Sequence, residues 1–250
     1  MKRIKIMGLC LVAVFALAAA AAASASAAPT YYECQKGAKG SGIYSDKKCS
    51  VNVGPGNGKY TLVPGRGKNK VFKGKGGAAT LYTPAVGGEV KCSTSKDEGF
   101  VDASFTGQEK VKVIFGKCVS LGKNCSSPGA KKGEIKTNPL SGTLGYISAS
   151  GPSVGVSLTG EGGKPSAEFN CEGLEIVTTG SVIGPVTGDI NTFSKESTDT
   201  FKTASGVQVP TKFEGGPKEV LESLINGSGP FESGEETTAK NKGEELEIKA

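Results

Sequence analysis

The chain has 250 residues, a formal net charge of +6 at pH 7, 38 glycines, and neither histidine nor tryptophan. The lack of histidine removes the usual general base of nucleophilic catalysis and the commonest metal ligand, so we expect no metal site and no cofactor. Glycine at about twice its usual share, together with more valine than leucine, is typical of short strands joined by tight turns.

Residues 1–27 have the three parts of a secretory signal peptide. Three basic residues precede an apolar run from Ile6 to Ala23, and Ala25-Ser26-Ala27 forms an A-x-A cleavage site. At about 18 residues the run is just long enough to cross a membrane, but the small residues at its end favour cleavage after Ala27. We therefore expect a secreted or cell-surface protein with no membrane anchor after cleavage.

The cysteines that follow the signal are even in number and include no C-x-x-C pair. In an exported chain this pattern predicts three disulfides, for which 15 pairings are possible, and it lacks the spacing of a zinc site. We expect neighbours to pair locally, as Cys34–Cys49 and Cys118–Cys125, while Cys92–Cys171 connects distant strands. A disulfide that closes a loop the size of 34–49 contributes about 3 kcal/mol by chain entropy.

Residues 28–57 predict a small disulfide-looped N-terminal segment that ends in the turn-rich sequence VNVGPGNG. Short apolar stretches punctuated by glycine then fill residues 58–250, which predicts a single β-rich domain. The stretch EKVKVIF (109–115) places Val111, Val113 and Phe115 on one apolar face with a period of two.

The expected strands recur at intervals of about ten residues, a spacing typical of an antiparallel β-sandwich or barrel. They lie at 70–74, 79–83, 88–93, 99–105, 109–115, 133–138, 142–150, 154–160, 167–171, 174–184 and 244–250.

One segment departs from the β pattern, and we expect a short helix near 217–226. Pro217 suits the first helical position, and Asn226-Gly227 supplies a stop. Four apolar residues between them share a helical face, and we expect this helix to cover an open end of the β domain.

The strings GKGGAATLYTPAVGGEVKC, GEIKTNPLSGTLGYI, CEGLEIVTTGSVIGP and PTKFEGGPKEVLES resemble a group of uncharacterised exported β-rich proteins of high-GC Gram-positive bacteria. The resemblance covers about residues 70–250. It implies export and a shared β domain. The group has no known activity, so no functional residue is carried over from it.

Two sequence motifs match those of serine hydrolases but lack the rest of the machinery. Gly151-Pro-Ser153-Val-Gly155 fits G-x-S-x-G, which needs a strand-to-helix turn and a histidine; here both flanks predict strands, so we expect a β-turn. Ser-x-x-Lys matches, such as Ser93 and Lys96, lie beside cysteines and lack the S-D-N and K-T-G elements of penicillin-recognising enzymes.

Paired carboxylates are the one catalytic arrangement that needs no histidine. Glu168 with Glu172, or Asp97 with Asp102, could serve a glycoside hydrolase or lyase if the carboxyl groups lay about 5–10 Å apart. Sugar-binding clefts commonly use broad aromatic platforms, and the chain has no tryptophan. We therefore expect no enzyme and keep a histidine-free glycosidase or lyase as the alternative.

Residues 31–75 contain four of the six tyrosines, and a run of basic residues follows from position 59 to 75, a composition suited to anionic polymers. We expect an exported, non-catalytic binding or structural protein of the cell envelope or extracellular matrix that contacts such a polymer, without specific recognition of nucleic acid. A solvated hairpin, kept soluble by its Gly-Lys pairs, is the alternative. The candidate contacts are Lys59, Tyr60, Arg66, Lys68, Lys70, Lys73 and Lys75.

Overall fold

The computed structural model of the chain describes residues 28–64 and 70–250. It is mainly β, with 62% of residues in strands and 3% in helical turns. The helical turns in the described residues are η1 (Pro84–Val86) and η2 (Glu161–Gly163). Within these ranges no helix has the length and apolar character that crossing a membrane requires. The expected signal peptide and the candidate contacts Arg66 and Lys68 lie outside the described residues.

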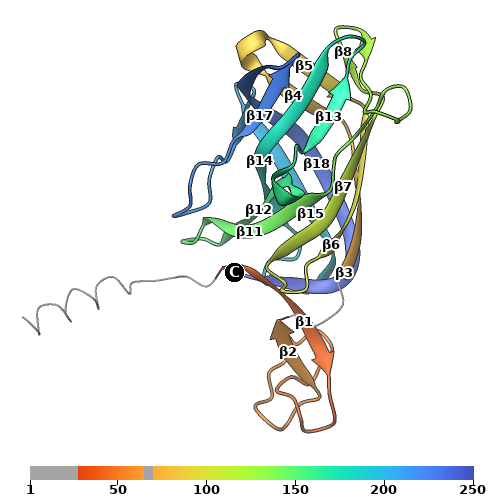
Figure 1. Ribbon diagram of the computed structural model, residues 1–250. Helices are drawn as coiled ribbons and strands as arrows, with labels where there is room; N and C mark the ends of the chain where they lie inside the picture. Colours follow the sequence, from red (N-terminus) through yellow and green to blue (C-terminus); the bar gives the residue numbers. More distant parts are fainter. Residues whose placement is uncertain (1–27, 65–69) are drawn as a thin grey trace, which may run out of the picture.

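Eight antiparallel strands close into a barrel (Figure 1). In order around the barrel they are β3 (Lys70–Gly76), β6 (Thr94–Val101), β7 (Gly107–Gly116), β11 (Leu140–Ser148), β12 (Ser153–Gly160), β14 (Glu175–Thr187), β15 (Ser194–Ala204) and β18 (Ser228–Lys249), which pairs back with β3. The mainly β, antiparallel prediction is confirmed, and of the two expected architectures the chain adopts the barrel.

The period-two pattern of β7 explains which of its faces turns inward. Val111, Val113 and Phe115 all line the barrel interior, whereas Lys112 between them is exposed. A closed barrel leaves no unpaired edge among these eight strands.

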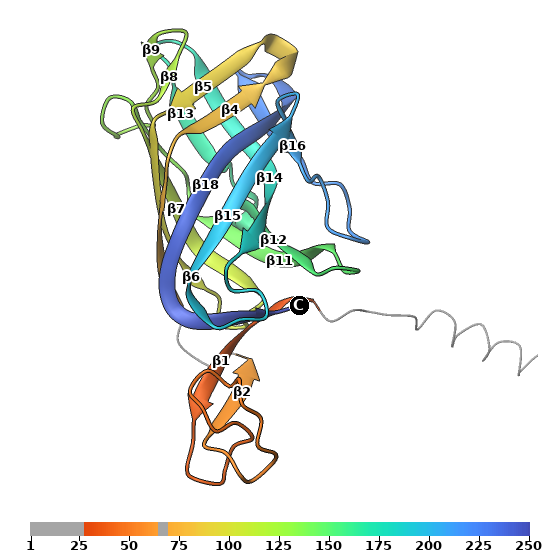
Figure 2. The ribbon, with the colours of Figure 1, turned by 180° about the vertical axis from the view of Figure 1, so that it is seen from behind.

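The two long strands β14 and β18 extend beyond the barrel at its upper end and pair there with several of the additional strands (Figures 1 and 2), while β10 pairs with β7 and β16 with β15. The first part of β18 pairs with β17 and β4, and its later part pairs with β15 and β3. The additional strands are β4 (Ala79–Thr83), β5 (Gly88–Cys92), β8 (Val119–Ser120), β9 (Lys123–Asn124), β10 (Glu134–Lys136), β13 (Ala167–Asn170), β16 (Val207–Val209) and β17 (Leu221–Ile225).

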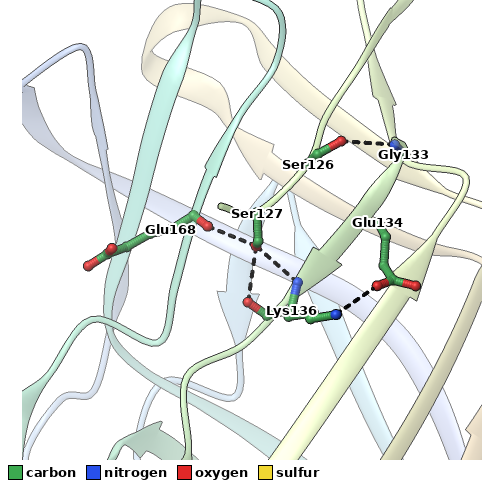
Figure 3. A network of polar contacts seen from close by, with 6 residues as sticks. All are labelled: Ser126, Ser127, Gly133, Glu134, Lys136 and Glu168. Atoms are coloured by element: carbon green, nitrogen blue, oxygen red, sulfur yellow. Dashed lines mark hydrogen bonds and ion pairs between the residues drawn. The ribbon is translucent and has the colours of Figure 1, made fainter. Parts of the chain in front are cut away.

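A network of polar contacts fastens β10 to β13 at this end (Figure 3). The hydroxyl of Ser127 lies 2.8 Å from the carbonyl oxygen of Glu168 and accepts the backbone N–H of Lys136 at 3.0 Å. The hydroxyl of Ser126 accepts the N–H of Gly133 at 2.9 Å. The contacts of Ser127 join two strands that are more than thirty positions apart in the chain and so help to close the upper end.

The N-terminal unit joins the lower end of the barrel through β1 (Thr30–Lys36). The first residues of β1 pair with the end of β18, and the following residues pair with β2 (Tyr60–Pro64). The β1–β2 hairpin holds the Cys34–Cys49 disulfide, the pairing expected from the sequence. Because β2 pairs with β1, the N-terminal unit extends to Pro64, beyond the segment 28–57 expected from the sequence.

The other two expected disulfides are wrong. The structure pairs Cys92 with Cys118 and Cys125 with Cys171, in place of Cys118–Cys125 and Cys92–Cys171. Strand register gives the reason: β5 pairs with β8, which sets Cys92 beside Cys118, and an antiparallel bridge between residues 126 and 170 sets Cys125 beside Cys171. Disulfides therefore stabilise the upper end as well as the N-terminal unit.

The expected helix near 217–226 is also wrong, because this segment contains strand β17. Leu221 and Ser223 alternate as buried residues, and β17 pairs with β14 on one side and β18 on the other. Asn226 and Gly227 both have positive φ, at 49° and 75°, and form the two-residue turn of the β17–β18 hairpin. An isolated two-turn helix is marginal, and Asn-Gly is a strong hairpin signal, so the strand is favoured.

Candidate functional site

The barrel contains a partly open cavity of about 110 Å³. It lies where three buried apolar clusters meet, with Phe72 and Leu140 on one wall, Phe169 toward the upper end, and Phe201 and Leu221 on the remaining wall. Apolar cavities of about 150 Å³ bind benzene. This cavity is smaller, so about six non-hydrogen atoms, as in benzene, are the upper limit for an occupant.

Three carboxyl side chains, those of Asp97, Asp199 and Glu235, line this mainly apolar space. They come from β6, β15 and β18, three different strands of the barrel. Among the described residues that line the cavity there is no lysine or arginine. The electrostatic environment is consequently one of buried acidic groups without an internal counter-charge, which is costly unless the groups are protonated or paired.

Asp199 has the most enclosed of these carboxyl groups. Its Oδ2 accepts a hydrogen bond of 2.8 Å from Asn241 Nδ2, while its Oδ1 has no partner among the described residues. Burial raises the pKa of Asp199 to about 7, and the nearby Asp189 and Asp97 add to the effect. The unpartnered Oδ1 of Asp199 can therefore bind a proton or a cation.

A glycine allows Asp97 and Asn241 to approach each other. In the strand register Gly74 stands opposite both residues, and a Cβ at this position would overlap oxygen atoms of both their side chains. Burial raises the pKa of Asp97 to about 6. We call Asp97, Asp199 and Asn241 the polar cluster.

The inward row of β18 adds further polar groups above the polar cluster. Burial raises the pKa of Glu235 to about 7, and its backbone N–H donates to Gln208 Oε1 at 2.9 Å. Thr237, two residues along the same strand, lines the cavity with a hydroxyl that has no partner among the described residues. Strand β18 thus supplies this cavity with Glu235 and Thr237, whereas its Asn241 lines a second, smaller cavity.

A smaller cavity of about 40 Å³ lies toward the lower end and includes Tyr31, Asp189 and Asn241. Tyr31 of β1 closes this end: its N–H donates to the carbonyl oxygen of Phe105, and its hydroxyl accepts from Gln108 Nε2 at 3.2 Å. Burial raises the pKa of both Tyr31 and Asp189, the latter to about 7. This space has room for ordered water only.

The structure brings together only part of the basic set expected from the sequence. Lys73 and Lys75 are exposed on β3, while Lys59 is exposed and Tyr60 half-buried at the N-terminal hairpin. Lys70 begins β3, and its side chain is outside the described part of the structure.

Two lysines that sequence reasoning missed face Lys75 across the outer surface of the barrel. Lys75 stands in register with Lys96 of β6 and with Lys240 of β18, and all three side chains are exposed. Lys73, by comparison, lies 4.0 Å from Glu98. We call Lys75, Lys96 and Lys240 the lysine row.

The carboxylate pairs suggested for a glycosidase do not line a common cleft. Asp97 lines the cavity, whereas Asp102 lies in the turn after β6 and accepts the N–H of Thr106. Glu168 is exposed, with its side chain directed away from the contacts drawn in Figure 3. Glu172 forms an ion pair of 3.6 Å with Lys132.

No protein-family model, curated protein or solved structure matches the chain. Among the described residues there is also no group of three or more Cys, Asp or Glu arranged to hold a metal ion. What the fold and the site define is a class: a closed eight-stranded barrel with a small, mainly apolar internal cavity and buried carboxyl groups.

Proposed function

We propose that this protein is an exported, non-catalytic binding protein whose barrel holds one small, largely apolar molecule. The observation that carries the proposal is the cavity of about 110 Å³ between the three apolar clusters. Eight-stranded barrels have interiors that either fill with side chains or hold one small ligand. An apolar pocket with a few convergent polar groups is the usual form of a small-molecule site.

The energetics of packing support an occupant. Protein interiors are close-packed, and at about 24 cal/mol per Å³ an unfilled cavity of this size lowers stability by about 2–3 kcal/mol. An apolar molecule that fills the space would recover much of this free energy through dispersion contacts. Binding would then stabilise the fold directly.

The small volume of the cavity also argues against the alternative that the protein is a glycosidase. A cavity that holds at most about six non-hydrogen atoms does not accommodate one sugar ring with its hydroxyl groups. With no histidine in the chain and the carboxyl groups enclosed, binding is better supported than hydrolysis.

The compartment follows from the disulfides, which form and persist in oxidising environments. Together with the signal-like residues 1–27, they support a secreted or cell-surface location as part of the proposal.

The test is to titrate the oxidised protein, residues 28–250, with cyclopentane and benzene and to monitor its amide chemical shifts by NMR. Residues that line the cavity are expected to shift in a saturable manner, while β1–β2 does not. Shifts that are absent, or spread over the outer surface only, would reject an internal site.

A second candidate function rests on the lysine row. Like charges directly opposite one another on a sheet are destabilising. Lys75 lies opposite two other lysines, Lys96 and Lys240. An anionic polymer lying across β18, β3 and β6 would relieve this repulsion. We propose this surface, in place of the longer set from 59 to 75, as the contact with an anionic component of the cell envelope or matrix.

A further inference from the structure

The polar cluster contains acceptor atoms without donors. Asp199 and Asn241 are only 6% and 4% exposed, and the Oδ1 atom of each has no hydrogen-bond partner among the described residues. A carboxylate oxygen and an amide oxygen can both accept hydrogen bonds and cannot donate them. Leaving such buried acceptors unmatched is costly, so a fitting occupant must bring N–H or O–H donors.

The arrangement over Gly74 strengthens this requirement. Because Asn241 directs its Nδ2 to Asp199, its Oδ1 is the atom directed toward Gly74, where the carboxyl oxygens of Asp97 also lie. Two acceptors that share one space repel each other unless a proton or a donor stands between them. One donor group with several hydrogens, placed in the cavity beside Asp97 and Asp199, would satisfy oxygens from β6 and β15 and relieve their repulsion with Asn241, which lines the adjoining smaller cavity.

Charge decides which kind of donor fits best. Asp97 and Asp199 both line the cavity, and no basic side chain does so among the described residues. In an interior of low dielectric, the electrostatic attraction between a carboxylate and a positive charge within hydrogen-bond distance is much stronger than in water. An ammonium group has three donors and one positive charge, which matches this set of acceptors.

We infer that the cavity selects a small aliphatic amine, whose ammonium group is held by Asp199 and Asp97 and whose hydrocarbon part fills the apolar space. This inference rests on the proposed internal site and adds the chemical class of its ligand. When the carboxyl group of Asp199 is protonated beforehand, the amine enters as R–NH3+, the carboxyl proton passes to solvent, and an ammonium–carboxylate pair remains. No bond of the ligand is made or broken.

The experiment compares three ligands of nearly identical size and shape: cyclopentylamine, cyclopentanol and methylcyclopentane. Each is titrated into the oxidised protein at pH 7.5, and amide shifts of cavity residues give the dissociation constants. Cyclopentylamine is expected to bind at least tenfold more tightly than methylcyclopentane, with cyclopentanol between them. Equal affinities would overturn the inference and leave the internal site intact, whereas no binding of any of the three would reject both.

The variant Asp199→Asn tests the assigned residue. It keeps the shape and one acceptor but removes the charge, so the preference for the amine is expected to fall at least tenfold while methylcyclopentane binds as before. Glu98→Gln, on β6 next to Asp97 but exposed, is the matched control and should leave all three affinities unchanged. If Asp199→Asn does not fold, Asp97→Asn takes its place. Retention of the full amine preference in the folded variant would overturn the inference.

Inorganic cations are the remaining competitor for the same oxygens. The titration with cyclopentylamine is repeated in sodium, potassium and calcium chloride at equal ionic strength. Amine affinity that is the same in all three salts supports the assignment. Saturable displacement of the amine by one of these ions, with larger shifts for the ion alone, would instead identify an inorganic cation site.

Discussion

Asn241 Nδ2 donates a hydrogen bond of 2.8 Å to Asp199 Oδ2 inside the barrel, and the second oxygen of each side chain has no partner among the described residues. The amide is thus oriented by one carboxyl group and presents its own oxygen to another, that of Asp97 over Gly74. A chain of acceptors in an apolar interior stores electrostatic repulsion that protonation or a ligand can release.

The free energy of unfolding is expected to fall as pH rises from 5 to 8. The pKa of Asp97 is raised to about 6, and those of Asp189, Asp199 and Glu235 to about 7, chiefly by burial. In the unfolded chain these groups return to about 4. Between pH 5 and about 7 the folded protein therefore binds more protons than the unfolded chain. The free energy of unfolding falls as the pH rises through this range and levels off above about pH 7.

Urea unfolding at pH 5 and pH 8, with the disulfides intact, checks this prediction. Asp199→Asn should reduce the difference between the two pH values by at least about 1 kcal/mol, since one pKa unit corresponds to about 1.4 kcal/mol. Asp97 and Asp189 interact with Asp199 and keep part of the slope, whereas the nearby Tyr31, whose pKa is raised, stays protonated throughout this range and adds nothing to it. A stability that rises over this range would contradict the assignment of these carboxyl groups to the interior.

Strand β15 and most of β18, which carry much of the site, could not be predicted from the sequence pattern. Strand β7 was predicted because its inward residues are apolar and alternate with lysines. By contrast β15 and most of β18 read as polar, since their inward positions include Asp199, Glu235 and Asn241. A period-two hydrophobic pattern cannot mark a strand whose inner face is polar, so only the last part of β18, near Leu246 and Ile248, was expected.

The disulfides and β17 were missed for a different reason. Their partners are set by long-range register, such as β5 beside β8 and β17 between β14 and β18, which local spacing does not contain. The Asn226-Gly227 signal was present but fits either a helix stop or a hairpin turn, and the pairing of β17 on both sides decided between them.

Peptide mapping of the non-reduced protein is expected to recover Cys92 joined to Cys118 and Cys125 joined to Cys171. Replacing both Cys125 and Cys171 with alanine should lower the free energy of unfolding by about 2–5 kcal/mol, because the loop at the upper end loses its tie to β13. Recovery of a Cys118–Cys125 peptide as the main product would show that the upper end is arranged differently.

Gly74→Ala should be strongly destabilising. The added Cβ would overlap oxygens of Asp97 and Asn241 and the chain cannot move away within the barrel wall, so we expect a loss of about 2–3 kcal/mol. Gly77→Ala is the control, since no atom lies within 4 Å of its Cβ position, and its effect should stay within about 0.5 kcal/mol. Thermal and urea unfolding of both variants measure the difference. Equal effects would show that the two side chains do not converge over Gly74.

Filling the cavity should abolish binding of apolar ligands. Ala79 lines the cavity, whereas its neighbour Ala78 is exposed, so Ala79→Leu and Ala78→Leu form a matched pair. We expect Ala79→Leu to lose the saturable amide shifts caused by cyclopentane and Ala78→Leu to keep them. Binding that survives in Ala79→Leu would place the ligand elsewhere.

The lysine row gives a prediction in which stability and binding change in opposite directions. Lys75→Glu would replace two repulsive cross-strand contacts, with Lys96 and Lys240, by attractive ones, and should stabilise the fold by about 0.5–1 kcal/mol. The same change removes the central positive charge, so retention on immobilised polyphosphate should weaken and its salt dependence should become shallower. Lys123→Glu, exposed on β9, is the control and should change neither property appreciably. If polyphosphate retains Lys75→Glu as strongly as the unmodified protein, the polymer contact lies elsewhere. If Lys75→Glu has a lower free energy of unfolding than the unmodified protein, the three lysines do not repel one another as their register implies.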